Sequence, residues 1–209
     1  MSSTVVIFLL VFGAFGWYLY KALRLTRNTV GKDSPLYVQR TYHMSAWEYF
    51  TNFDSVINYS IYPIGPVLLI LLLRADWSDL TQSPLYLVGL VVIIAGLVWM
   101  SLMSYRLLLL DINHWKYTRD KTLIFDPTDY SLAVQTSART LSIRQADIAS
   151  IEYYYSNIRL FGSYSYYRLK LMNDEELILS SRSKGLWALY EYFKNVPSHS
   201  HRQDYPIIR

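Results

Sequence analysis

The feature that most constrains this chain is a run at residues 85–105 that contains no charged side chain. A helix needs about 20 apolar residues to cross the ~30 Å of hydrocarbon in a bilayer, so this run predicts a membrane span. Two other apolar runs, at residues 4–20 and 56–73, indicate the same structure more weakly. The sequence therefore predicts three spans, at about 4–20, 56–73 and 85–106, within a membrane region at residues 1–110.

The placement of charge predicts an orientation for these spans. Basic residues gather between the first and second apolar runs, whereas the loop at residues 74–84 carries one Arg and two Asp. Cytoplasmic loops carry an excess of Lys and Arg, so we expect the N-terminus outside and the C-terminal region in the cytoplasm. No basic residue precedes the first run, which favours a retained anchor, with a cleaved signal peptide as the alternative.

Composition and motifs exclude several classes of function. The chain has no cysteine, which excludes disulfides, Cys-ligated zinc, iron–sulfur clusters and thiol catalysis. Its net charge of +4 is far below that of a nucleic-acid-binding domain. Because phosphate loops, nucleophile elbows and HExxH motifs are absent, we expect no enzyme, no catalytic residue and no cofactor. The spacing of His199, His201 and Asp204 suits a metal, but they lie in a segment without periodicity, which favours a solvated tail.

After residue 110 the pattern changes to short alternating segments separated by turn residues, which is typical of antiparallel strands. The sequence predicts a β domain at residues 111–196 and a flexible tail at 197–209. The predicted strands are residues 113–118, 122–126, 130–135, 139–144, 149–156, 165–172 and 175–180. An amphipathic helix should follow at about residues 184–195, with Ser183 as its cap.

Seven strands closed by one C-terminal helix resemble a pleckstrin-homology-like (PH-like) barrel. The segments TLSIRQADIASIEYYYSN and FGSYSYYRLKLMNDEELILSS, followed by the helix, are similar to bacterial PH-like domains that follow a transmembrane hairpin. The fold class is then a membrane α-helical part with three spans plus a mainly-β PH-like barrel of about seven strands. We expect Ile151, Leu171 and Leu177 to point into this barrel, near Trp187 or Leu189.

The resemblance implies a non-enzymatic module. PH domains bind phosphoinositides in eukaryotes, and in bacteria PH-like domains serve mostly as assembly or interaction domains of membrane proteins. It therefore indicates a protein of the bacterial inner membrane. In the lipid-binding members Lys and Arg cluster around the first hairpin, and here Lys116, Arg119 and Lys121 are the candidates for a lipid-headgroup site. Nonspecific attraction of anionic lipid is the alternative explanation of these charges.

Strand alternation also predicts a protein interface, because it turns Tyr154, Tyr166 and Arg168 to one outer face. Tyr and Arg are enriched in protein interfaces, although ordinary cross-strand pairing explains the same residues equally well. We expect a scaffold or accessory subunit of a membrane complex, with the lipid bilayer and other protein subunits as partners and no nucleic acid. The alternatives are a reader of anionic lipid headgroups and an auxiliary subunit of a transporter, the latter suggested by Pro63 and Pro66 in the second span.

Overall fold

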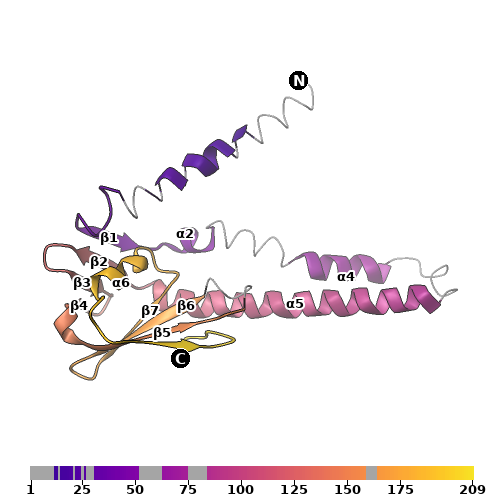
Figure 1. Cartoon of the computed structure of the whole chain (residues 1–209). Coiled ribbons are helices and arrows are strands. Elements are labelled where there is room, and N and C mark those ends of the chain that lie inside the picture. Colours follow the sequence, from indigo (N-terminus) through magenta and orange to yellow (C-terminus); the bar gives the residue numbers. More distant parts are fainter. Residues whose placement is uncertain are drawn as a thin grey trace.

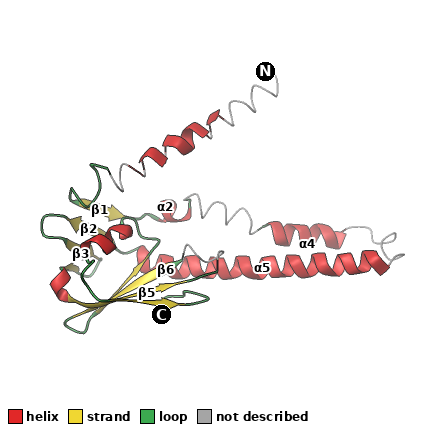
Figure 2. Ribbon diagram, in the orientation of Figure 1, coloured by secondary structure: helices red, strands yellow, loops and turns green. Residues whose placement is uncertain are grey.

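The computed structural model describes residues 12–13, 15–20, 22–24, 26, 31–51, 63–74, 84–158 and 164–209. Figure 1 shows a domain of two sheets at one end of a long helix, α5 (Pro84–Thr118), with the shorter α4 (Ile64–Arg74) beside it. The same view coloured by secondary structure separates the strands of the domain from the helical hairpin (Figure 2). The architecture is therefore a β domain joined directly to a pair of helices.

The first sheet begins before the helical hairpin in the sequence. Its order is β1 (Arg40–His43), β2 (Thr122–Asp126), β3 (Ser131–Gln135) and β4 (Thr140–Ile143), and all neighbours are antiparallel. Because β1 pairs with β2, the hairpin is inserted between two adjacent strands of one sheet. From the sequence, the whole barrel was predicted after residue 110, so this strand was not expected.

The strand predicted at residues 113–118 is wrong, because these residues form the last turns of α5. The buried residues here, Asp111, His114 and Thr118, follow helical spacing and pack on the domain. Polar and aromatic residues alternate over this short segment, which imitates the period of a strand. The helix of the third predicted span, placed at about residues 85–106 within a membrane region that ends at residue 110, therefore continues to Thr118.

The second sheet has the order β7 (Glu176–Ser180), β6 (Ser165–Leu171), β5 (Ile148–Tyr155) and β8 (Ser198–Arg202). The strand β8 runs parallel to β5, whereas the other neighbours are antiparallel. The prediction of a flexible tail after residue 196 is therefore wrong for this segment. Each side chain of β8 is exposed, so the strand has no hydrophobic alternation by which the sequence could reveal it.

The core lies between the two sheets and under the C-terminal helical turns, η4 (Leu186–Ala188) and α6 (Leu189–Tyr192). Ile151, Leu171 and Leu189 are buried there, and Leu177 packs against them, as predicted. Trp187 remains 40% exposed. The largest fully buried apolar side chains of this core are Tyr192, Phe125, Phe193, Leu132, Ile143, Leu169, Leu179 and Leu189.

Among the described residues, one helical segment, Val88–Thr118, is long and apolar enough to cross a membrane. It contains most of the third predicted span. The helix α4 covers only part of the second predicted span. The beginning of that span and most of the first predicted span lie outside the described residues. The described helical residues of the first, such as Trp17 and Tyr20, are exposed.

The two helices of the hairpin meet at Gly65. A Cβ atom at this glycine would lie 2.8 Å from Ser101 Oγ and 3.4 Å from Leu97 O. Small residues allow helix backbones to approach closely, as in membrane helix pairs. The absence of a side chain at Gly65 thus sets the distance between α4 and α5.

Gly65→Leu should force the two helices apart. Overpacking of a close contact costs roughly 1–3 kcal/mol, so we expect a lower midpoint of thermal unfolding for the full chain in detergent. Gly89→Leu is the matched control, because no neighbouring atom lies within 4 Å of a Cβ at this position of α5. Equal midpoints for the two variants would contradict the close contact at Gly65.

Candidate functional site

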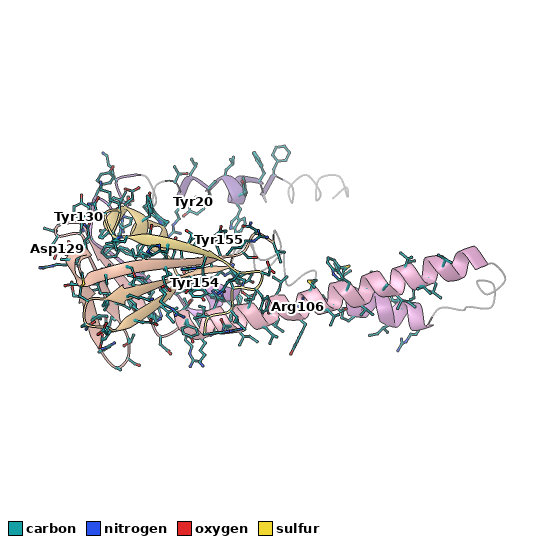
Figure 3. The ribbon with its side chains drawn as sticks, turned by 60° about the horizontal axis from the view of Figure 1, so that its bottom comes forward. Tyr20, Arg106, Asp129, Tyr130, Tyr154 and Tyr155 are labelled. Atoms are coloured by element: carbon teal, nitrogen blue, oxygen red, sulfur yellow. The ribbon has the colours of Figure 1, made fainter. Side chains whose placement is uncertain are left out.

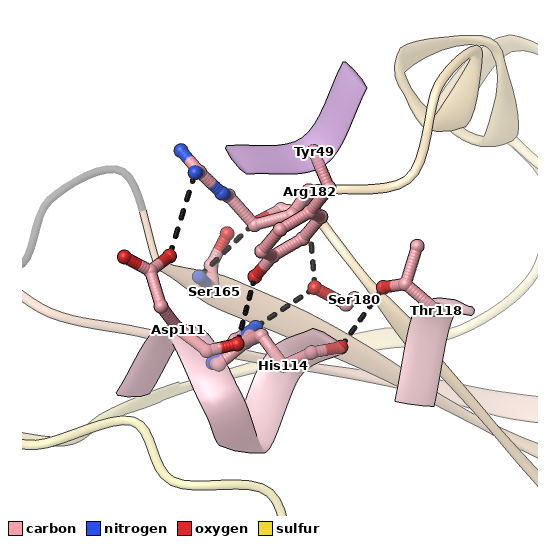
Figure 4. A network of polar contacts seen from close by, with 8 residues as sticks. Tyr49, Asp111, His114, Thr118, Ser165, Ser180 and Arg182 are labelled. Carbon is pink, nitrogen blue, oxygen red and sulfur yellow. Dashed lines mark hydrogen bonds and ion pairs between the residues drawn. The ribbon is translucent and has the colours of Figure 1, made fainter. Parts of the chain in front are cut away.

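A buried polar cluster joins the hairpin to the β domain (Figure 4). Asp111 Oδ1 on α5 lies 3.4 Å from Arg182 Nη2, and the two side chains expose only 0% and 6% of their surface. On α2 (Ala46–Phe50), the Tyr49 hydroxyl donates a hydrogen bond of 3.2 Å to the backbone carbonyl of Asp111. The Arg182 guanidinium lies 5.0 Å from the centre of the Tyr49 ring and 5.4 Å from that of Tyr164. Segments before the hairpin, within it and next to strands of the second sheet thus meet at one ion pair.

His114 extends this cluster to the C-terminal segment. Its Nδ1 lies 2.8 Å from Ser180 Oγ, and its Nε2 lies 2.9 Å from the carbonyl oxygen of Pro206. A carbonyl oxygen can only accept, so Nε2 carries the proton and Nδ1 accepts from the Ser180 hydroxyl. Burial lowers the pKa of His114 to about 4, with a smaller contribution from the charge of Arg182 and against the opposing effect of the Pro206 carbonyl. The imidazole is therefore neutral at pH 7.

This pKa predicts that the protein loses stability in mild acid. An unfolded histidine has a pKa near 6.5, so the folded state binds fewer protons between about pH 6.5 and pH 4. The stabilisation is complete above pH 6.5 and decreases as the pH falls, by about 2 kcal/mol at pH 5. Chemical unfolding of the full chain in detergent at several pH values measures this loss.

His114→Asn removes the titrating group and serves as the control for this pH dependence. The variant should be less stable at pH 7, because Asn cannot reproduce both hydrogen bonds, but its stability should change much less between pH 7 and pH 5. An unchanged pH profile in His114→Asn would assign the acid sensitivity to another group.

The C-terminal segment is held to α5 by further hydrogen bonds. Asn113 Nδ2 donates to Ile208 O at 3.1 Å, and Ile208 N donates to Asn113 Oδ1 at 2.8 Å. The Tyr205 hydroxyl donates to the carbonyl of Arg106. These contacts between α5 and the rest of the domain were not expected from the sequence, although Asp111, the first acidic residue after the uncharged run at residues 85–105, was a signal for them.

The structure brings the predicted interface residues together but covers part of their face. Tyr154 stacks on Tyr166 with ring centres 4.6 Å apart, and the Arg168 guanidinium lies 5.6 Å from the Tyr154 ring. Tyr166 is only 2% exposed, so the expectation that all three side chains face outward is wrong for this residue. The His114 ring of α5 lies 6.5 Å from the Tyr166 ring on this side of the sheet. Figure 3 shows Tyr154 on the sheet and Arg106 on the adjacent helix.

Tyr154 belongs to a polar network on the outer face of β5 and β6. Its hydroxyl donates a hydrogen bond of 2.7 Å to Glu152 Oε2, and Lys170 Nζ lies 2.7 Å from Glu152 Oε1. The hydrogen bond to Glu152 raises the pKa of Tyr154 to about 12, while Lys170 lowers the pKa of Glu152. On β8, the His201 ring stacks on Tyr154 at 4.8 Å. Aromatic and charged side chains thus contact one another across the outer face of β8, β5 and β6.

The predicted headgroup residues do not converge on one site. Lys116 is exposed near the end of α5, and Arg119 pairs with its neighbour Asp120 at 3.2 Å. Lys121 instead points toward β7, where its Nζ donates a hydrogen bond of 2.5 Å to the carbonyl of Ile178. Burial lowers the pKa of Lys121 to about 8. Of these three candidates, Lys116 and Arg119 are thus exposed, whereas Lys121 is half-buried.

A cavity of about 270 Å³ opens beside Lys121 between the two sheets. Its walls contain both signs of charge, since Lys121, Arg139 and Glu176 all line it. Arg139 also pairs with Glu175 at 2.9 Å. The full lining is Tyr117, Lys121, Val134, Thr136, Arg139, Leu141, Glu176, Leu177 and Ile178. Because its cations already have partners, this cavity is poorly suited to a phosphorylated headgroup.

In the described part of the chain, no group of three His, Asp or Glu side chains has the arrangement of a metal site. His201 of the sequence candidates stacks on Tyr154, and His199 is exposed on the same strand. These residues belong to an ordered strand, so their spacing reflects the exposed side chains of β8.

Comparison with known proteins identifies a family for the chain. A family model described as "PH domain" matches residues 41–182, a range that starts in β1, includes the inserted hairpin and ends just after β7. No curated protein and no solved structure matches the chain. The matched range covers more than half of the sequence and contains both sheets except β8. The chain therefore belongs to the PH domain family, with a helical hairpin between the first two strands of the domain.

Proposed function

We propose that the protein is a non-enzymatic scaffold or accessory subunit of a membrane complex, whose PH domain binds a protein partner at the cytoplasmic surface. The observation that carries this proposal is the construction of the domain around the hairpin, with β1 before it and β2 after it. A domain built in this way is held at the membrane by its own helices. It has no need of a lipid-headgroup site for recruitment.

The surface of α5 supports insertion in a membrane. Val91, Val92 and Ile93 expose 65%, 66% and 52% of their surfaces, although they lie in the middle of the uncharged run. A continuous apolar surface of this kind is unstable in water and stable in hydrocarbon. Its aromatic residues Trp99 and Tyr105 lie toward the domain, where side chains of this type favour the membrane interface.

The pairing of β1 with β2 supports two crossings. Both strands lie on the same side of any membrane, so the chain between them must cross an even number of times. If α5 is one crossing, the apolar segment that includes α4 is the return crossing, and Gly65 is a contact between the two. The basic residues near β1 and after α5 favour the cytoplasmic side for the domain.

The exposed side chains favour a protein partner over a specific lipid. Tyr154 and Arg168 remain partly exposed on the outer face of the second sheet, and residues of these types carry much of the binding energy in protein interfaces. The alternative, a reader of anionic headgroups, has Lys116 and Arg119 as its exposed charges. It is less well supported, because the adjacent cavity is lined by the carboxylate of Glu176.

A photo-crosslinking residue in place of His201 tests the proposal, because this exposed side chain lies on Tyr154. In native membranes it should form an adduct with a protein of one defined mass. Combined Tyr154→Ala and Arg168→Ala should abolish this adduct, since each interface residue can contribute ~2 kcal/mol or more. Lys116→Gln with Arg119→Gln is the matched control and should retain it.

The opposite pattern would contradict the proposal. An adduct or membrane distribution that depends on Lys116 and Arg119, and not on Tyr154 and Arg168, would favour the headgroup reader. Tyr166 is left unchanged in this experiment because it is buried, and its replacement would confuse unfolding with lost binding.

A further inference from the structure

One face of α5 carries an apolar stripe that continues beyond the uncharged run. The stripe consists of Val98, Leu102, Tyr105, Leu109 and Ile112, which follow one another at spacings of four and three and so share a helix face. These side chains expose 45%, 54%, 59%, 38% and 53% of their surfaces. The described part of the chain therefore leaves the whole stripe uncovered.

The last two residues of the stripe, Leu109 and Ile112, lie on the domain side of Arg106. At 1.5 Å per residue, Ile112 is about 10 Å beyond Tyr105 along the helix axis. On the opposite face at the same level, Leu110, Asp111 and His114 are buried against the domain. One side of this part of α5 is thus attached to the PH domain, while the other side remains apolar and open.

The stripe ends in positive charge. Lys116 follows Ile112 by four residues on the same face, is exposed, and forms no ion pair within the described residues. An apolar helix face that ends in Lys or Arg is typical of segments that lie at the membrane surface, where the long side chain reaches the phosphates.

We propose that Leu109 and Ile112, the last two residues of the stripe, lie in the headgroup region of the membrane, with Lys116 at the lipid phosphates. This inference rests on the proposed insertion of α5. A helix in a membrane leans by about 20° on average, and a lean toward the stripe brings Ile112 close to the bilayer surface. The occupant is lipid because the stripe is continuous with the face that Val98 and Leu102 present to hydrocarbon. The consequence is a fixed orientation of the PH domain relative to the membrane.

Depth measurements test this contact, and the absence of cysteine makes single-site labelling simple. Nitroxide labels are placed on Val98→Cys, Ile112→Cys and Asp120→Cys in the full chain, reconstituted in vesicles of phosphatidylcholine and phosphatidylglycerol. Accessibility to oxygen and to a water-soluble nickel chelate then gives the depth of each label. We expect Val98 in hydrocarbon, Ile112 at headgroup depth and Asp120 in water. Leu109→Cys is a second site should the Ile112 variant fail to fold.

The possible results separate this inference from the membrane proposal. One result is that the label at Ile112 is as accessible to nickel as the label at Asp120, while the label at Val98 lies in hydrocarbon. This result overturns the contact of Ile112 with the headgroups and leaves the membrane proposal intact. A label at Val98 in water overturns the membrane proposal as well. A label at Ile112 shielded from both reagents overturns lipid contact in favour of a protein surface. Lys116→Glu should make the Ile112 label at least twofold more accessible to nickel, and an unchanged value overturns the role of this lysine.

Discussion

Residues 104–209 expressed without the segment 31–51 should fail to fold, although they contain seven of the eight strands. The missing segment supplies β1, which covers the edge of β2. It also supplies Tyr42, whose ring packs edge-on against Phe125 at 6.0 Å, and the fully buried Tyr49. Loss of one buried aromatic side chain costs ~3–5 kcal/mol, and a typical domain has a total stability of only ~5–15 kcal/mol.

Circular dichroism and dispersion of amide proton signals would measure this failure. The matched control joins residues 31–51 to residues 104–209 through a flexible Gly and Ser linker in place of the hairpin. This chain should give a folded β domain, because the linker restores β1 and the hydrogen bond from the Tyr192 hydroxyl to Pro35 O, which is 2.7 Å long. A cooperative unfolding transition in the fragment without β1 would show that the first strand is dispensable.

The buried ion pair should be the most sensitive single contact. Asp111→Ala leaves the Arg182 guanidinium buried without its carboxylate, which costs roughly 3–5 kcal/mol. We expect a large decrease in the midpoint of thermal unfolding of the full chain in detergent. Glu48→Ala is the control, because it breaks an exposed pair with Lys184, which is worth roughly 0–1 kcal/mol.

A double variant shows whether the stability lost in Asp111→Ala comes from the unpaired buried charge of Arg182 or from distortion of the surrounding structure. Asp111→Leu combined with Arg182→Met replaces the pair by apolar side chains of similar size, and much of the lost stability should return. If Asp111→Ala destabilises the protein no more than Glu48→Ala, water reaches the Asp111–Arg182 pair. The pair then contributes less to stability than its burial indicates.

The sequence predicted those strands and helices whose pattern is contained in a short stretch of the chain. Short segments with the residue pattern of strands, separated by turn residues, revealed β2 and β6, and the uncharged run revealed most of α5. The strand β1 escaped because its segment, RTYH, is short and has no apolar alternation, and its partner lies 79 positions away. Pairing between strands so far apart in the sequence depends on tertiary contacts, which a local sequence pattern does not reveal.

The candidate interface shows the same limit. Alternation correctly placed Tyr154, Tyr166 and Arg168 on one face of the sheet. It gave no information about which other segments cover this face, so the burial of Tyr166 beside α5 was not expected. The three basic candidates differ for a similar reason, since the contact of Lys121 with β7 depends on how α5 enters the domain.

The insertion of the hairpin between β1 and β2 has a consequence for biosynthesis. A ribosome makes β1 first, and this strand must wait without its partner until the hairpin and β2 have followed. If the hairpin crosses a membrane, as proposed above, the first sheet closes only when the chain between β1 and β2 crosses an even number of times, because a single crossing would leave the two strands on opposite sides. On this proposal, chains with failed insertion should carry unpaired strand edges, which chaperones and proteases recognise, and closure of the sheet would report correct insertion of the hairpin.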